Sequence, residues 1–388
     1  MRSAQLATLR AEIEEVNFAL LELLSRRGRL VMDIHRVKSR EGIPIHLPDR
    51  EQQMLADLVK RNRGPFSDET VRELFKQILR ASVDLMETRR ERDLQVSRAR
   101  RPADLHVAVG DRVVGRAPVV IAGPCAVESE EQMDETGRFL SSRGVRFLRG
   151  GAFKPRSSPY SFQGLGAAGL KLLRATADRY GMLVVTEVMD PRDVELCAGQ
   201  ADVLQVGSRN MYNYDLLREL GHVARPVLLK RGLSATLDEL LWSAEYVVSG
   251  GNESVILCER GIRTYERETR NTLDLSAVPL LRAKSFLPVI VDLSHALGRR
   301  DILAPMGRAA LAAGANGLMV EVHPSPALAR SDSQQQLDFE GFDRFLHETE
   351  LTGYAEHAGV TTSTWGAKAS DSPDWQVATR QCEAGSPT

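Results

Sequence analysis

Apolar side chains recur at helical spacing near the start of the chain. Leucine, isoleucine and valine stand three or four positions apart from Leu6 to Val37, and no proline occurs before Pro44. This spacing predicts one long helix over about residues 4–40. At about 1.5 Å per residue, the helix would be roughly 55 Å long.

Two shorter helices should follow this long one. The second should begin near Asp49, directly after Pro48, and the third at Ser67, a residue type that caps helix N-termini. Two such helices cannot cover a partner of about 55 Å within one small unit. The apolar stripe of the first helix therefore predicts an intertwined dimer, with a long solvated or coiled-coil spacer as the alternative.

The pattern changes at the end of the helical region. Residues 89–101 hold six arginines and few apolar side chains, which predicts a polar helix end that runs into a linker closed by Pro102. Residues 105–115 then alternate around Gly110-Asp111 as in a small β-hairpin. Such a hairpin could close the bottom of a barrel.

Eight short runs rich in β-branched residues alternate with helical stretches beyond residue 118. They are 119–123, 146–151, 183–188, 202–207, 226–232, 254–261, 288–295 and 316–323. Nearly continuous apolar strands that alternate with helices are typical of a parallel sheet covered on both faces, and eight of them predict a closed (β/α)8 TIM barrel. The expected class is α/β, with an all-helical three-helix domain before the barrel.

These patterns divide the chain into four regions. We expect a helical domain over residues 1–90, a linker over 91–104, a barrel over 105–347 and a C-terminal tail over 348–388. The tail is rich in Ser, Thr and Gly and lacks periodicity, so it is expected to be mobile. Two tryptophans could instead pin it to the surface, namely Trp365 and Trp375.

Composition narrows the possible partners and the compartment. A formal net charge of −1 provides no overall field for nucleic acid or an anionic membrane, and no apolar run is long enough to span a bilayer. The N-terminus lacks the pattern of a secretory peptide. Four cysteines without a CxxC pair indicate a reducing cytosol, and we expect a cytoplasmic protein: Cys125, Cys197, Cys258 and Cys382.

Cationic side chains follow strand after strand, at the end of a barrel where active sites lie. A single such residue is often a solvated loop charge, but seven at strand ends predict a substrate set with several negative charges, because guanidinium and ammonium groups bind phosphate and carboxylate oxygens. The seven are Arg149, Lys154, Arg156, Arg209, Lys230, Arg231 and Arg260.

A second group of strand-end residues has the chemistry of metal ligands. Cys125 follows the first strand, His295 the seventh and Glu321 the eighth, while Asp332 lies in the loop beyond; His323 also closes the eighth strand. Each could be structural when taken singly. Together, a thiolate, an imidazole and two carboxylates suit Mn²⁺, Fe²⁺, Co²⁺ or Zn²⁺ rather than Ca²⁺.

The same residues lie in strings that resemble 3-deoxy-7-phosphoheptulonate synthase (DAHP synthase), in the branch that often carries a fused mutase domain. The resemblance spans about residues 105–346, although Leu293 stands where the family usually has proline. The strings include AGPCAVES, RGGAFKPRSSPYSFQGLG, TEVMD, VGSRNMYN, LLKRG, VDLSHALGRR and VEVHPSPALARSD.

The resemblance implies a reaction: phosphoenolpyruvate, erythrose 4-phosphate and water give 3-deoxy-D-arabino-heptulosonate 7-phosphate and phosphate, the first step of the shikimate pathway. Arg156 and Ser157 would hold the sugar phosphate. A divalent metal, Mn²⁺ first and Co²⁺, Fe²⁺ or Zn²⁺ as alternatives, would be held by Cys125, His295, Glu321 and Asp332. Phosphoenolpyruvate would be bound by Arg149, Lys154, Arg209, Lys230 and Arg260.

Two side chains are candidates for proton transfer beside the metal ligand His295. Lys154 stands among arginines, which should lower its pKa and suit it to protonate the aldehyde oxygen. Glu187 ends the third strand and could orient or activate the water.

The string LRAEIEEVNFALLELLSRRGRLVMDIHRVK resembles the helical chorismate mutases. Arg27 and Lys38, eleven residues apart, share one face of the helix, whereas Arg10 lies roughly 25 Å from Arg27 along the axis and would serve a partner chain's site. The residues at that family's site positions are Arg10, Arg27, Lys38, Arg50, Glu51 and Met86.

Two of these family positions depart from the usual pattern. Leu47 replaces an acid, and Met86 replaces a glutamine that bonds the ether oxygen; the loss of one such donor can cost about 10²–10³ in rate. The helical domain could therefore be a weak mutase, a sensor of chorismate or prephenate, or a dimerisation module without a ligand.

Two alternatives remain for the barrel. It could be another phosphoenolpyruvate-dependent sugar-acid synthase that uses a longer aldehyde, although those relatives usually carry Asn where this chain has the proline of KPRS. It could also be a regulatory binding protein on an inactive barrel. The expected assembly is a homodimer or a homotetramer.

Overall fold

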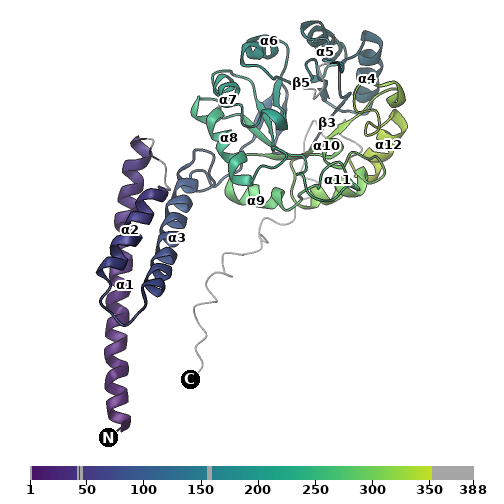
Figure 1. The fold of residues 1–388 in the computed structure, drawn as a ribbon. Coiled ribbons are helices and arrows are strands. Elements are labelled where there is room, and N and C mark those ends of the chain that lie inside the picture. The colour runs from purple at the N-terminus through teal and green to yellow at the C-terminus, as the bar shows by residue number, and fades with distance from the viewer. Residues whose placement is uncertain (1, 42, 44–46, 155–159, 352–388) are drawn as a thin grey trace.

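The computed structural model describes residues 2–41, 43, 47–154 and 160–351 of the chain. Within these residues, three helices come first and an eight-stranded barrel surrounded by helices follows (Figure 1). The predicted fold class is therefore confirmed. Residues 352–388 lie outside the described residues, and with them the predictions for the tail, Trp365 and Trp375.

The three predicted N-terminal helices are all present. α1 runs over Arg2–Glu41 without a break, α2 over Pro48–Arg61 and α3 over Asp68–Asp93. Pro48 occupies the first turn of α2, where its missing N–H is not needed. The hydroxyl oxygen of Ser67 accepts the backbone N–H of Thr70 at 3.1 Å and caps α3, as predicted.

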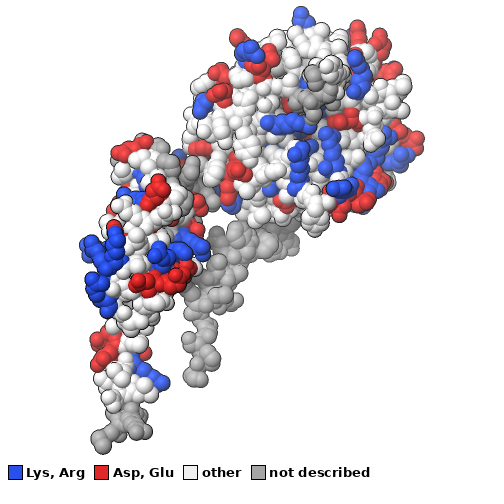
Figure 2. Space-filling view, viewed as in Figure 1, with Lys and Arg blue, Asp and Glu red and all other residues white. Residues whose placement is uncertain are grey.

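The apolar stripe of α1 is largely uncovered by its own chain. α2 and α3 lie along one part of α1, and its N-terminal end extends beyond them (Figure 1). Leu9, Ile13 and Val16 are 53%, 65% and 57% exposed, respectively. In the space-filling view, uncharged surface separates the charged groups along these helices (Figure 2). A single chain therefore leaves large apolar side chains of α1 in water.

The segment after α3 packs on the barrel. Val96 is fully buried, and the carboxylate of Glu245 accepts the backbone N–H groups of Gln95 at 3.0 Å and Val96 at 3.2 Å. The backbone N–H of Arg98 donates to the carbonyl oxygen of Lys284 at 2.8 Å. The many arginines around these residues concealed this anchor in the sequence.

The predicted hairpin closes the bottom of the barrel. β1 (Val107–Val109) pairs antiparallel with β2 (Arg112–Val114) around Gly110, which has a φ of 54°. The hairpin's buried valines join the side chains that fill the barrel interior, among them Phe147, Val185, Leu228, Ile256, Ile290 and Met319. The hairpin thus contributes to the core of the barrel.

The eight predicted strands form one closed parallel barrel, in the order β10-β3-β4-β5-β6-β7-β8-β9. Their bounds are Val119–Gly123 (β3), Phe147–Arg149 (β4), Leu183–Glu187 (β5), Val203–Val206 (β6), Val227–Lys230 (β7), Val255–Glu259 (β8), Val289–Asp292 (β9) and Gly317–Glu321 (β10). Every strand is almost fully buried because its two faces contact the interior and the surrounding helices.

The surrounding layer covers the barrel with apolar helix faces. Its helices are α4 (Glu130–Ser142), α5 (Ala167–Arg179), α6 (Val194–Ala198), α7 (Tyr214–Gly221), α8 (Leu237–Ser249), α9 (Ala277–Lys284), α10 (Leu293–Leu297), α11 (Leu303–Ala312) and α12 (Phe339–Glu348). Within the part of the chain that the structure describes, the 3₁₀ turns are η1 (Pro191–Asp193), η2 (Ser208–Asn210) and η3 (Pro326–Leu328). Among the described helices, none has the length and apolar content that a membrane span requires.

Candidate active site and metal centre

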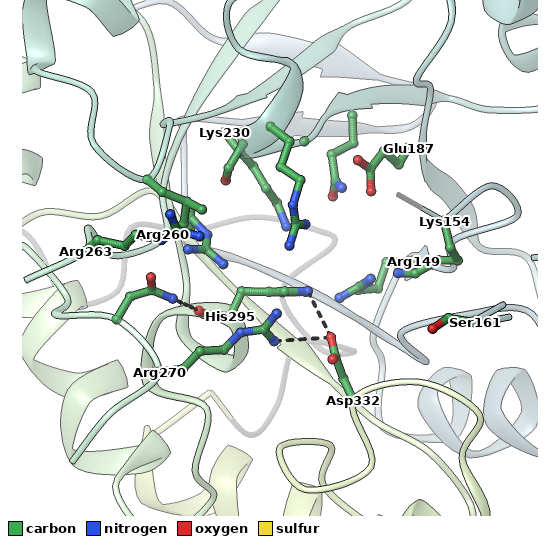
Figure 3. Close-up of a pocket in the computed structure, with 16 residues that line it drawn as sticks. Arg149, Lys154, Ser161, Glu187, Lys230, Arg260, Arg263, Arg270, His295 and Asp332 are labelled. Carbon is green, nitrogen blue, oxygen red and sulfur yellow. Dashed lines mark hydrogen bonds and ion pairs between the residues drawn. The ribbon is translucent and has the colours of Figure 1, made fainter. Parts of the chain in front are cut away.

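A cavity of about 470 Å³ opens where the barrel strands end. Arg149 ends β4, Glu187 ends β5 and Lys230 ends β7, and Figure 3 shows their side chains converging on one space. The loops after these strands supply the rest of the lining. The carboxyl ends of the strands therefore hold the candidate site, as the barrel fold predicts.

Cationic side chains dominate this cavity. All five residues expected to bind phosphoenolpyruvate line it, and Arg263 and Arg270 add two guanidinium groups that the sequence had not singled out. The lining carboxylates are those of Glu187 and Asp332. Arg156 and Ser157 lie outside the described residues. The five predicted cations are Arg149, Lys154, Arg209, Lys230 and Arg260.

Arg231 does not join the other strand-end cations. Its Nη1 lies 2.9 Å from Glu259 Oε2 and 2.8 Å from Asp274 Oδ2, and its Nε donates to the carbonyl oxygen of Ala235. The side chain is buried in this ion-pair network. The expectation that it faces the substrate set is therefore wrong, because its guanidinium is bound by Glu259 at the end of β8 and by Asp274 in the loop before α9.

The four predicted metal ligands meet beside the cavity. One donor atom from each of Cys125, His295, Glu321 and Asp332 lies within 4.8 Å of the others. Cys125 Sγ is 3.3 Å from Asp332 Oδ2, and His295 Nε2 is 3.4 Å from Glu321 Oε1 and 3.7 Å from Asp332 Oδ2. Residues up to 207 positions apart in sequence thus form one compact cluster.

Local backbone geometry brings these ligands together. Gly123 ends β3 with a φ of 146°, and a Cβ there would meet the carbonyl oxygen of Arg149 at 2.1 Å, so only glycine allows the turn that leads to Cys125. Asp332 has a φ of 50°, a left-handed conformation that costs free energy and is concentrated at functional sites.

The donor set fits a divalent cation. Burial raises the pKa of the Cys125 thiol to about 12, with Glu321 adding to the effect, so the thiolate requires a nearby positive charge. Burial acts against the charged form of Asp332, yet Arg270 and His295 lower its pKa to about 2. One sulfur, one imidazole nitrogen and two carboxylates match the preferences of Mn²⁺, Fe²⁺, Co²⁺ and Zn²⁺.

Lys154 connects this cluster to the cavity. Its Nζ lies 3.1 Å from Cys125 Sγ and donates to the carbonyl oxygen of Cys125 at 2.9 Å. The prediction that its pKa is lowered is wrong for this structure. Burial does act in that direction, but the anionic forms of Cys125 and Glu187 outweigh it and raise the pKa of Lys154.

Asp292 is a site residue that sequence reasoning missed. Its carboxylate is fully buried; Oδ2 lies 2.8 Å from His295 Nδ1 and accepts a hydrogen bond from Lys230, while Oδ1 accepts the backbone N–H of His295. A carboxylate at Nδ1 directs the other ring nitrogen toward a metal. The available signal was the aspartate three positions before His295.

His323 lies beside the cluster without joining it. Its Nδ1 accepts the backbone N–H of Ser325, and its buried Nε2 is 3.7 Å from a carboxylate oxygen of Glu128. His323 is therefore not one of the four donors of the cluster.

The mutase-like residues come from all three helices of the N-terminal region. Arg27 donates to the hydroxyl of Ser82 on α3, a residue that the sequence had not singled out, while Met86 is buried. Glu51 lines a cavity of about 420 Å³ between α2 and α3. The others are Arg50, which lines a separate cavity of about 280 Å³, the half-buried Lys38 and the exposed Arg10.

Comparison with known proteins finds a family match for each of the two parts of the chain. Residues 99–355 match the DAHP synthetase I family and residues 9–87 match chorismate mutase type II. The chain is 54% identical over 254 residues to a phospho-2-dehydro-3-deoxyheptonate aldolase of Thermotoga maritima, covering 65% of this chain and 75% of that protein. A 2-dehydro-3-deoxyphosphooctonate aldolase of Acidithiobacillus ferrooxidans is 31% identical over 55% of this chain and 81% of its own length.

Solved structures agree with these matches. The crystal structure of the Thermotoga maritima phospho-2-dehydro-3-deoxyheptonate aldolase (DAHP synthase) superposes with a TM-score of 0.65 and 52% identity, over 66% of this chain and 76% of that one. A truncated form of the synthase from the same organism gives 0.62 and 49%, over 66% and 94%. With the barrel, the cationic cavity and the four-donor cluster, these matches show that the chain belongs to the DAHP synthetase I family and carries a chorismate mutase type II segment before its barrel.

Proposed function

We propose that the barrel condenses phosphoenolpyruvate with erythrose 4-phosphate and water to give 3-deoxy-D-arabino-heptulosonate 7-phosphate and phosphate, the entry step of the shikimate pathway. One observation carries this proposal: a cavity lined by seven Lys and Arg side chains adjoins a thiol, imidazole and carboxylate cluster. The cations match the phosphate and carboxylate groups of the two substrates, and the cluster matches a divalent cation.

Phosphoenolpyruvate would bind to the most buried cationic side chains of the cavity. Arg149, Lys154, Lys230 and Arg260 are buried, where a bound anion would be poorly screened by water. A buried Nη1 of Arg260 makes no hydrogen bond to protein, so a substrate oxygen is its natural partner. With Arg209 these residues would bind the phosphate and carboxylate and direct C3 of the enol toward the aldehyde. The loop that carries Arg156 and Ser157 would bind the phosphate of the sugar.

The metal site would lie at the aldehyde end of the cavity. Cys125, His295, Glu321 and Asp332 would hold a divalent ion, and the ion would act as a Lewis acid on the aldehyde oxygen. We propose Mn²⁺ as the first choice, with Co²⁺, Fe²⁺ and Zn²⁺ as ions that suit the same donors.

We propose proton transfer and water positioning as the roles of two further side chains. Lys154 Nζ is cationic and adjoins Cys125, so it can donate a proton to the oxygen of the aldehyde as the carbon–carbon bond forms. Glu187, which lies near Lys154 in the cavity lining (Figure 3), would orient the water that adds to C2. The resulting hemiketal phosphate then loses inorganic phosphate to leave the 2-keto acid.

One assay tests the main proposal. The protein is incubated with phosphoenolpyruvate, erythrose 4-phosphate and Mn²⁺, and the enol absorbance is followed with and without a chelator. We expect absorbance to fall only with both substrates and free metal. A replacement of the sugar by five-carbon arabinose 5-phosphate tests the alternative of a longer aldehyde, which the 54% identity to a heptonate enzyme against 31% to an octonate enzyme disfavours.

We propose that the helical domain binds chorismate or prephenate and turns chorismate over weakly. Arg27 and its partner Ser82 provide polar groups for such a ligand, while the thioether of Met86 can accept but not donate a hydrogen bond. Chorismate decay should be slow in the wild type and faster in Met86→Gln. If neither protein binds or consumes chorismate, the domain serves dimerisation alone.

The assembly follows from the uncovered stripe of α1. We propose a homodimer through this helix, or a homotetramer that contains it, with Arg10 serving the partner's site. The free thiols of Cys125, Cys197 and Cys258 support a reducing compartment, and we propose the cytoplasm.

A further inference from the structure

Three consecutive glutamines follow the metal-ligand candidate Asp332, in the loop between β10 and α12. Gln334 is exposed, whereas Gln335 and Gln336 are 4% and 0% exposed. A buried side-chain amide has to find hydrogen-bond partners, so the two inner glutamines must be bound within the protein. Both find them around the four-donor cluster.

Gln335 contacts two of the four candidate ligands. Its Nε2 donates to Glu321 Oε2 and lies 3.4 Å from Asp332 Oδ2. Its Oε1 accepts a hydrogen bond of 2.7 Å from Arg270 Nη1. Because a guanidinium only donates, this contact fixes the orientation of the amide and leaves its N–H groups to the carboxylates.

The two oxygens of Glu321 therefore have different surroundings. Oε1 faces His295 Nε2 at 3.4 Å and accepts a hydrogen bond from Arg149 at 2.9 Å. Oε2 is taken by the amide of Gln335. The carboxylate is fully buried, so no bulk water competes for either oxygen.

Gln336 acts on the backbone instead. Its Oε1 accepts the N–H of Cys125 at 3.0 Å, and its Nε2 donates to the carbonyl oxygen of Ser331 at 2.7 Å. It thereby links the loop after β3 to the loop that carries Asp332. Gln336 therefore connects two loops through their backbones, whereas Gln335 contacts candidate ligand atoms directly.

We infer that Gln335 is a positioning residue that restricts Glu321 to one-oxygen ligation of the metal. This inference rests on the proposed metal site. A catalytic metal centre has to keep a coordination position open for substrate, and hydrogen bonds to ligands commonly determine how many atoms each ligand contributes. With Oε2 bound to Gln335, Glu321 presents Oε1 alone to the other three donors. A neutral amide does this without adding another anionic group beside the cluster.

Co²⁺ binding provides the test, in the full-length protein. Gln335→Met and Gln335→Leu remove the donor at nearly constant side-chain volume, and Gln334→Met is the matched control in the same loop. Each protein is purified, stripped of metal, checked for folding by thermal unfolding and titrated with Co²⁺. Two signals are recorded: the thiolate-to-cobalt charge-transfer band, which reports Cys125, and the d–d absorption, whose intensity falls as the coordination number rises.

In both Gln335 variants we expect the charge-transfer band to persist and the d–d intensity to fall, since Glu321 then binds through both oxygens. Metal affinity should change by at least about tenfold. If the d–d intensity and affinity of a folded Gln335 variant match those of Gln334→Met, the inference is overturned while the metal site stands. If the wild type shows no charge-transfer band, the proposed metal site itself is wrong.

Discussion

Lys154 lies where the proposed metal site and the substrate cavity meet, with its ammonium between Cys125 and the cavity lining. Burial acts to lower the pKa of this ammonium, but the negative charges of Glu187 and of Cys125 in its ionised form outweigh burial and raise the pKa. A cationic Lys154 carries the proton to be donated, but its raised pKa makes it a weaker acid than the lowered pKa expected from its arginine neighbours would have made it. Lys154 thus remains the proposed proton donor, although its pKa is shifted in the opposite direction from the one predicted.

Lys154→Met should lower kcat by at least about 10²-fold, the usual minimum for the loss of a general acid. The substitution keeps the length of the side chain and removes the proton donor and a substrate contact. Steady-state assays of condensation at saturating substrate provide the measurement. Lys171→Met, at an exposed position of α5, is the control and should behave as wild type. Near-normal turnover of Lys154→Met would remove the proposed role.

The sequence reveals the site residues that are recognisable from their type and position, but not those whose role depends on contacts with distant side chains. Cys125 and Glu321 were predicted because each lies at a strand end and has a side chain that binds metals. Asp292 and Gln335 act through other side chains, and their residue types are common on any loop. Their roles follow only from contacts with His295 and Glu321, so local sequence carries little sign of them.

At the scale of elements, the β1–β2 hairpin can be tested with a pair of matched variants. Val109 is 2% exposed against the barrel interior, while Val113 on the paired strand is 37% exposed. Val109→Asp should lower the free energy of unfolding by at least about 3 kcal/mol, because apolar burial is lost and a carboxylate is buried without a partner. Val113→Asp should change it little. Urea unfolding followed by tryptophan fluorescence measures the stability of both variants. Equal losses of stability would contradict the conclusion that the hairpin contributes to the barrel core.

The anchored segment after α3 predicts a pH dependence. Burial opposes ionisation of Asp104, but Arg98 and Arg282 outweigh it and lower its pKa. Because the pKa of Asp104 is lower in the folded than in the unfolded protein, the ionised carboxylate stabilises the fold. This stabilisation is fully present above the unfolded-state pKa of about 3.9 and is lost as pH falls through the folded-state pKa. Asp104→Asn should therefore cost up to about 1 kcal/mol at pH 7 and progressively less below about pH 4.

Urea unfolding of wild type and Asp104→Asn across this pH range provides the check. Asp215→Asn, at an exposed position of α7, serves as the control. A difference between wild type and Asp104→Asn that stays constant down to the acid limit would show that the ion pairs with Arg98 and Arg282 contribute nothing.

At the scale of the whole molecule, the proposed dimer forms through α1. Its N-terminal end extends beyond α2 and α3 and exposes Ile13 and Val16 (Figure 1). Ile13→Glu with Val16→Glu should convert the assembly to smaller species, because charges would be buried against a second copy. Light scattering after size exclusion measures the mass. Ala11→Glu, about 160° around the helix from Ile13, is the control; a wild-type monomer would contradict the proposal.

The sequence by itself determined the three helices, the eight strands, the hairpin and the metal-ligand candidates. Each of these depends on periodicity along one segment or on the end of one strand, and both are local properties of the chain. The tertiary structure alone decided that Arg231 turns away from the cavity, that Val96 anchors the linker, and that Gln335 contacts Glu321. Those outcomes depend on which atoms of distant loops come within hydrogen-bonding or packing distance, and this is settled only when the barrel closes.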